Sequence, residues 1–129
     1  MIVVLARIDH REDVSPEYER RAARMLEIVQ RMPGFLGNKV YVATDGEQLS
    51  LWRFASEEAL EAWRMHPEHL ESQEFGRESV FDYYWGQVCR VIRQYEFKRG
   101  DGRREIPADE PWRPAYVEGR AAHPTGAVD

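Results

Sequence analysis

Residues 51–76 read LWRFASEEALEAWRMHPEHLESQEFG, and this stretch holds the main structural transitions of the chain. It opens as the end of an apolar strand. Ser56 has the side chain of a helix N-cap, and the short helix that follows carries Trp63. Pro67 suits the first position of a second helix, and Gly76 is a plausible residue to end it. The stretch therefore predicts a strand followed by two short helices.

The remaining elements follow from hydrophobic periodicity and turn residues. We expect a strand over residues 2–8, a helix from Ser15-Pro16 to about residue 31, and a hairpin of strands over residues 37–44 and 48–54 that turns at Asp45-Gly46. From Phe81 to Phe97 alternate residues keep a period of two, which predicts one long final strand.

The order of strand, helix, strand, strand, helices and strand predicts an α+β fold. We expect a ferredoxin-like antiparallel sheet with its helices on one face. Tyr41, Trp52 and the aromatic residues of the last strand are more than one layer of helices can bury. Because an uncovered apolar sheet face marks an interface, we expect a homodimer packed sheet to sheet.

The 129 residues are expected to form one domain over residues 1–98, followed by a Pro/Gly-rich C-terminal tail over residues 99–129. Trp112 and Tyr116 are the obvious anchors for that tail. The single cysteine, Cys89, excludes an intrachain disulfide and suits a reducing compartment. Its apolar strand predicts a buried, inert thiol.

Charge and hydropathy exclude several partners. The net charge is −5, and the best basic cluster, Arg20, Arg21 and Arg24, shares its predicted helix with Glu17 and other acidic residues, so a nucleic-acid partner is not expected. No apolar run reaches the roughly 18 residues that a membrane span needs. The first residues read as a strand and not as a signal peptide, so the expected location is the cytoplasm.

The strand order, the LWRFASEEALEAW segment, the HPEH helix start and the closing strand together resemble the antibiotic biosynthesis monooxygenase family. That family belongs to the dimeric α/β barrel superfamily, and the resemblance covers about residues 2–97. It implies a homodimer that uses molecular oxygen on an aromatic or phenolic small molecule. It also implies that neither flavin nor metal is needed.

The resemblance implies roles for six residues. His69 would be the catalytic base and Arg7 would steady the developing oxyanion. Trp63 would shape the pocket. The other residues expected to contact substrate are His66, Phe54 and Tyr83.

The same residue types have structural interpretations. Trp63 on an apolar helix side is expected to pack in the core, and His69 to be a surface histidine beside Glu68 or Glu71. At the start of a helix, the helix dipole is expected to lower the pKa of His69. His66 and His69 have metal-compatible spacing but no third ligand, so no metal site is expected. His10 has no supporting neighbours in the sequence.

Two other functions remain open. Haem-degrading members of the family carry a histidine ligand about ten residues beyond the helix tryptophan, where this chain has Gln73. Cofactor-independent members carry an asparagine one turn before that tryptophan, where this chain has Ala59. The alternatives are therefore a haem-binding or haem-degrading protein that uses His66 or His69, and a non-catalytic ligand-binding dimer.

Overall fold

The structure is a computed structural model that describes residues 1–11 and 15–110. Its elements are, in chain order, β1 (Ile2–His10), α1 (Pro16–Val29), β2 (Phe35–Val42), β3 (Gln48–Phe54), α2 (Glu57–Arg64), α3 (Pro67–Ser79), β4 (Phe81–Arg90), β5 (Gln94–Lys98) and β6 (Gly102–Ile106). Trp112 and Tyr116, the predicted anchors of the tail, lie outside the described residues.

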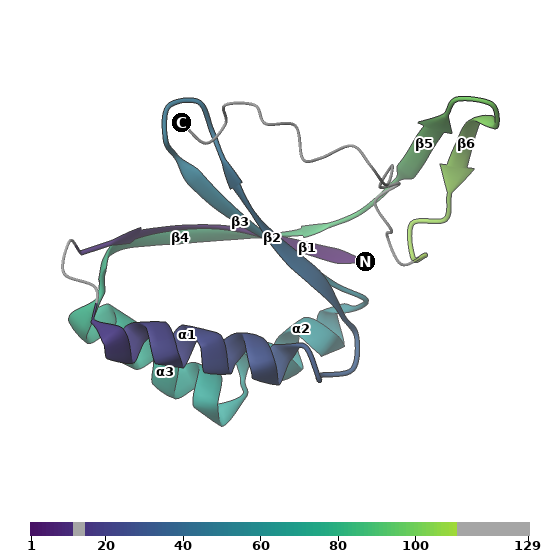
Figure 1. The fold of residues 1–129 in the computed structure, drawn as a ribbon. Coiled ribbons are helices and arrows are strands. Elements are labelled where there is room, and N and C mark those ends of the chain that lie inside the picture. The colour runs from purple at the N-terminus through teal and green to yellow at the C-terminus, as the bar shows by residue number, and fades with distance from the viewer. Residues whose placement is uncertain (12–14, 111–129) are drawn as a thin grey trace.

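Four strands form one antiparallel sheet in the order β2-β3-β1-β4. The three helices lie together on one face of this sheet (Figure 1). This is the α+β ferredoxin-like arrangement that the order of elements predicted, and the structure confirms it.

The core lies between the sheet and the helices. Its buried members are Ile2 of β1, Val29 of α1, Phe54 of β3 and Trp63 of α2. Each comes from a different element, so burial of these four side chains fixes α1 and α2 against the sheet. Phe35 packs edge-on against Phe54, with ring centroids 5.5 Å apart.

The opposite face of the sheet is here called the open face. Because side chains alternate along a strand and Ile2 and Val4 pack toward the core, Val3 and Leu5 point the other way. The strand register then gives the members of the open face: Val3, Leu5, Arg7 and Asp9 of β1, Lys39 and Tyr41 of β2, Leu49, Leu51 and Arg53 of β3, and Tyr83, Trp85, Gln87 and Cys89 of β4.

None of the described helices covers the open face (Figure 1). Tyr41 and Tyr83 are 43% and 52% exposed there. Trp52, one of the aromatic residues that a single layer of helices was not expected to bury in full, lies on the helix side beside Phe35. Cys89 is exposed on the open face, so the prediction of a buried thiol was wrong.

The predicted helix starts are confirmed. The Ser15 hydroxyl oxygen accepts a hydrogen bond from the backbone N–H of Tyr18, and that of Ser56 accepts one from Ala59. His66 caps α3 in the same way through its Nδ1 atom, which accepts from the N–H of Glu68. The Asp45-Gly46 turn joins β2 and β3 as expected.

Gly76 does not end its helix, contrary to the prediction. α3 continues to Ser79, and Gly76 is buried inside it. A Cβ atom built on Gly76 would lie 2.2 Å from Cε2 of Phe81, so the glycine is needed for the close approach of α3 and the first residue of β4.

The prediction of one long strand from Phe81 to Phe97 was also wrong. β4 ends at Arg90. The backbone N–H of Val91 still donates a hydrogen bond to the Met1 carbonyl oxygen, and after this residue the chain leaves the sheet. The period-two pattern continues in β5, which pairs with β6 in a separate hairpin. This hairpin, residues 94–106, is here called the arm. It spans the predicted boundary at residue 98, so β6 lies within residues expected to be a tail.

Candidate functional site

The His69 imidazole stacks on the indole of Trp63. The ring centroids are 4.1 Å apart and the ring planes differ by 13°. Trp63 is 5% exposed and belongs to the core, whereas His69 is only half-buried. The indole therefore acts as a fixed platform that sets the plane of the imidazole.

Hydrogen bonds determine which nitrogen of His69 carries the proton. Nδ1 lies 3.1 Å from the backbone carbonyl oxygen of Trp63, which can only accept. Nδ1 therefore donates, and in the neutral ring Nε2 is the acceptor. The side-chain amide nitrogen of Gln73 lies 3.3 Å from Nε2 and donates to it. Gln73 thus occupies the lone pair that a catalytic base would use.

Burial lowers the pKa of His69, and the nearby charge of His66 lowers it further. Hydrogen bonds to the backbone of Trp63 and Arg64 act in the opposite direction. The direction agrees with the prediction, but the first cause is desolvation and not the helix dipole. His69 is therefore a neutral acceptor near pH 7.

His66 and Phe54 are two further residues that were expected to contact substrate. The His66 ring centroid is 6.2 Å from that of Trp63, and its Nδ1 atom is used in the cap of α3. Phe54 is 1% exposed in the core that also contains Trp63. Phe54 therefore belongs to the buried core and offers no exposed surface to a ligand in this structure.

Arg7 and Tyr83 lie on the open face, away from His69. The guanidinium of Arg7 is paired with Asp9 and Glu47, and the hydrogen bond to Asp9 is the first cause that raises the pKa of Arg7. Tyr83 is paired in register with Asp9. Within one chain the structure therefore brings Trp63, His66 and His69 together, and it separates Arg7 and Tyr83 from them.

The sequence interpretation missed a second ring cluster. His10 Nε2 lies 2.9 Å from the hydroxyl oxygen of Tyr18, and both rings contact Phe81 edge-on. The expectation that His10 lacks supporting neighbours was therefore wrong. Burial raises the pKa of Tyr18. The pairing of β1 with β4 places Phe81 opposite His10, and α1 brings Tyr18 to both rings. No sequence spacing indicated this cluster.

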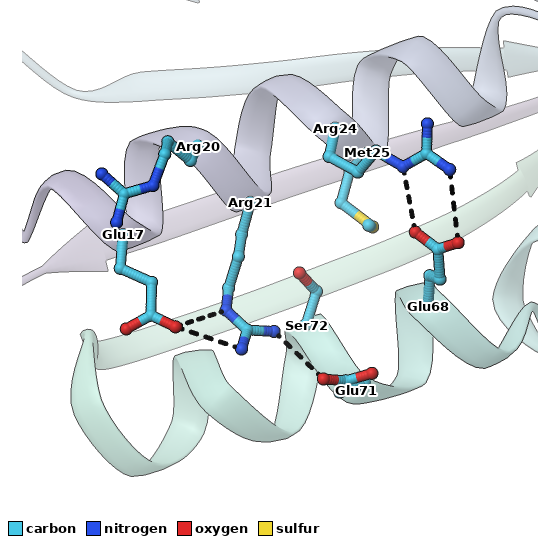
Figure 2. A pocket seen from close by; sticks show the side chains of 8 residues that line it. All are labelled: Glu17, Arg20, Arg21, Arg24, Met25, Glu68, Glu71 and Ser72. Carbon is cyan, nitrogen blue, oxygen red and sulfur yellow. Dashed lines mark hydrogen bonds and ion pairs between the residues drawn. The ribbon is translucent and has the colours of Figure 1, made fainter.

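The basic cluster on α1 lines a cleft against α3 (Figure 2). Arg21 pairs with Glu17 and Glu71, and Arg24 pairs with Glu68 and Glu27. The charges in this cleft are balanced, and the ion pairs join the two helices. Exposed pairs of this kind add little to stability, because water and salt screen them.

Among residues 1–11 and 15–110, no group of three or more His, Cys, Asp or Glu side chains is placed to hold a metal ion. No helix within the same residues is long and apolar enough to cross a membrane.

Comparison with known proteins identifies the family. The model of the antibiotic biosynthesis monooxygenase family matches residues 1–74, more than half of the chain, so the chain belongs to this family. A relative, the uncharacterized protein YqjZ of Bacillus subtilis (strain 168), is 33% identical over 81 residues, which make up 63% of this chain and 71% of that protein.

Solved structures show the same fold. Rv0793 from Mycobacterium tuberculosis has a TM-score of 0.60 at 21% identity, over 72% of this chain and 96% of that chain. SnoaB, a cofactor-independent oxygenase from Streptomyces nogalater, has a TM-score of 0.56 at 17% identity, over 72% of this chain and 93% of its own. More than a quarter of this chain has no counterpart in either.

The structure gives a reason for the alanine at position 59, one turn before Trp63. A Cβ atom built on Gly34 would lie 2.6 Å from the Cβ of Ala59, so the backbone at Gly34 passes directly over this side chain. Gly34 also has a positive φ of 84°, which suits glycine. A larger side chain at position 59 would have to point away from Gly34.

Proposed function

We propose that the chain is a homodimeric oxygenase that adds one atom of molecular oxygen to an electron-rich phenolic substrate without flavin or metal. The observation that carries the proposal is the neutral imidazole of His69, fixed on Trp63 with its Nε2 lone pair held only by the side-chain amide of Gln73. Membership of the family and the fold shared with SnoaB, a cofactor-independent oxygenase, support the reaction class.

In the proposed reaction the substrate hydroxyl takes the place of the Gln73 amide at Nε2 of His69. The imidazole accepts the phenolic proton, and the resulting electron-rich anion reacts at carbon with oxygen to form a carbon–oxygen bond and a peroxide. The imidazolium returns its proton to the peroxide, and the resulting hydroperoxide loses water together with the hydrogen of the same carbon, which leaves a carbonyl group. One oxygen atom enters the product and the other leaves as water.

The homodimer would be built on the open face. Two copies that pack sheet to sheet would bury Tyr41, Tyr83 and the leucines of this face, which the helices of one chain leave uncovered. Such packing places Arg7 at the interface, where its pairs with Asp9 and Glu47 already occupy its guanidinium. The oxyanion role of Arg7 therefore forms no part of the proposed mechanism.

The histidines do not fit a haem site as they stand. Both nitrogens of His69 are engaged, by the Trp63 carbonyl and by Gln73, and Nδ1 of His66 caps α3. Haem iron would have to displace the Gln73 amide from Nε2 of His69 or bind Nε2 of His66. Haem-degrading members of the family carry their histidine ligand at the position of Gln73, so we propose no step through haem, and a hemin titration is expected to give no histidine-dependent Soret shift.

Oxygen uptake with a panel of anthrone-like and quinol substrates tests the proposal. We expect uptake with at least one substrate, lost in His69→Ala and kept in His66→Asn, which retains a capping side chain. Uptake that persists in His69→Ala would remove the assigned base. Binding of the panel without uptake by the native protein would instead indicate a non-catalytic ligand-binding dimer.

A further inference from the structure

The arm extends away from the four-stranded sheet (Figure 1). Its two strands, β5 and β6, form a sheet of their own. Ile92, at the base of the arm, is 87% exposed, and Tyr95 and Phe97 are each 61% exposed. An isolated two-stranded hairpin is at best marginally stable in water, so exposed aromatic residues on such a hairpin indicate a surface that becomes covered.

One face of the arm combines aromatic rings with arginines. Tyr95 is in register with Glu105, and Phe97 with Arg103, so all four side chains share a face. The guanidinium carbons of Arg93 and Arg103 lie 4.9 and 5.1 Å from the ring centroid of Tyr95, and that of Arg99 lies 5.4 Å from Phe97. This set of six residues is here called the cationic face of the arm: three arginines, two aromatic rings and one glutamate.

The base of the arm is held in place. Gln94 is 9% exposed, and its side-chain amide donates to the carbonyl oxygens of Pro107 at 2.8 Å and Glu110 at 3.1 Å. Arg93 and Glu105 form an ion pair across the two strands. The cationic face is therefore presented in a preorganised form, which lowers the entropy that docking would cost.

The open face carries a surface of complementary composition at one end. There Tyr83 is paired in register with Asp9, and Trp85 with Arg7, while Glu47 reaches Arg7 from the β2–β3 turn. This acidic end, defined by Arg7, Asp9, Glu47, Tyr83 and Trp85, has two aromatic rings, two carboxylates and one guanidinium. The cationic face of the arm has the opposite balance of charge.

We propose that the cationic face of the arm docks on the acidic end of the open face of a second copy of this chain. The inference rests on the proposed homodimer and adds a second contact to it. The arm follows the end of β4 where Arg90 pairs with Ile2, whereas Asp9 lies at the other end of β1. When two sheets pack with their strands antiparallel across the interface, these opposite ends meet, and the two-fold axis makes the contact twice.

A second copy is favoured over a nucleic-acid strand, although aromatic rings with arginines also suit stacked bases. The chain carries a net charge of −5, which opposes binding to phosphates. A partner surface of opposite charge balance is present on the chain itself. An oligonucleotide is therefore an outcome of the test and not the proposal.

Sedimentation velocity over a range of concentrations tests the docking. The aromatic variant is Tyr95→Ser with Phe97→Ser, and its control is Met65→Ser, a 51% exposed apolar residue at the end of α2. The charge variant is Arg99→Glu, and its control is Arg31→Glu on an 80% exposed side chain. We expect each arm variant to raise the dimer dissociation constant by roughly tenfold or more, with each control within about twofold.

The outcomes separate this inference from the proposed function. A native dimer whose dissociation constant is unchanged in both arm variants would overturn the docking and leave the homodimer in place. A native protein that stays monomeric at every concentration would overturn both. If the dimer dissociation constant is unchanged in the arm variants but these variants no longer bind a single-stranded oligonucleotide that the native protein binds, the cationic face is a nucleic-acid site and the docking is overturned.

Discussion

Trp63 and His69 form a parallel ring stack in which His69 also donates its Nδ1 proton to the backbone carbonyl of Trp63. The two residues are six positions apart and lie on different helices, α2 and α3. The break between those helices at His66-Pro67 lets the second ring fold back over the first. One tryptophan thus fixes the plane and the tautomer of one histidine.

Acid should destabilise the protein through His69. Because its pKa is lower in the folded chain, protons prefer the unfolded chain at acidic pH. The contribution of neutral His69 to the free energy of unfolding is fully present above its pKa in the unfolded chain, about 6.5. This contribution is lost as the pH falls through the lower pKa of the folded chain. Urea unfolding above and below pH 6.5 should show a smaller acid loss in His69→Gln than in the native protein. An equal loss would contradict this, and His66→Asn serves as the control.

Gln73 should hold His69 in its neutral form, because the amide donates to Nε2 only while that nitrogen is unprotonated. Gln73→Leu is expected to raise the pKa of His69, and Gln73→Glu to raise it more because a carboxylate favours the imidazolium. An NMR titration of the imidazole measures both. As a control, Glu74→Gln changes an exposed neighbour and should leave the pKa of His69 nearly unchanged. An unchanged pKa of His69 in Gln73→Leu would show that the hydrogen bond from Gln73 does not hold the ring neutral.

Gly76→Ala should destabilise the fold although alanine is normally the better helix residue. The added methyl group would meet the Phe81 ring at 2.2 Å, so the ring or α3 must shift. Overpacking of this kind costs about 1–3 kcal/mol. Chemical denaturation measures the change in the free energy of unfolding, with Glu78→Ala on the exposed side of α3 as the control. A stabilised Gly76→Ala variant would show that the contact relaxes freely.

Ser56→Ala should weaken the start of α2. The hydroxyl of Ser56 is 3.1 Å from the N–H of Ala59, and loss of such a cap costs about 1 kcal/mol. Ser56→Asp keeps a capping oxygen and should remain close to native stability. Thermal unfolding of the two variants side by side gives the comparison, and equal losses in both would assign the effect to something other than the cap.

Cys89 should report on dimerisation. Its thiol is exposed on the open face of one chain and would be covered when two sheets pack together. Its rate of alkylation per chain is therefore expected to fall as protein concentration rises through the dimer dissociation constant. A rate independent of concentration, in a protein that sediments as a dimer, would place the interface elsewhere.

Local sequence signals predicted most of the elements correctly. Ser15, Ser56 and His66 act within their own turns, so the helix starts follow from the sequence alone. The Asp45-Gly46 turn joins two strands of suitable pattern for the same reason. The prediction for Gly76 was wrong because the sequence does not distinguish a glycine that ends a helix from one that makes room for a neighbouring ring. The position of the Phe81 ring is known only from the tertiary structure.

The final strand shows the limit of periodicity. Alternation from Phe81 to Phe97 is real, but a pattern of side chains does not say which backbone a strand will pair with. β4 pairs with β1 as far as Arg90, whereas β5 pairs with β6 in a separate sheet. The arm and its exposed aromatic residues therefore became visible only in three dimensions.

For the candidate site, the sequence determined the residue types and their local frame: a capped helix with Trp63, and His69 in the first turns of the next helix. Only the tertiary structure decided that these rings stack and that the Gln73 amide donates a hydrogen bond to Nε2 of His69. It also decided that Arg7 lies on the opposite face of the sheet. The physical reason is the sequence distance over which each kind of interaction acts. Caps and turns act over three or four residues, whereas the face on which a strand residue lies depends on the register between strands far apart in the chain.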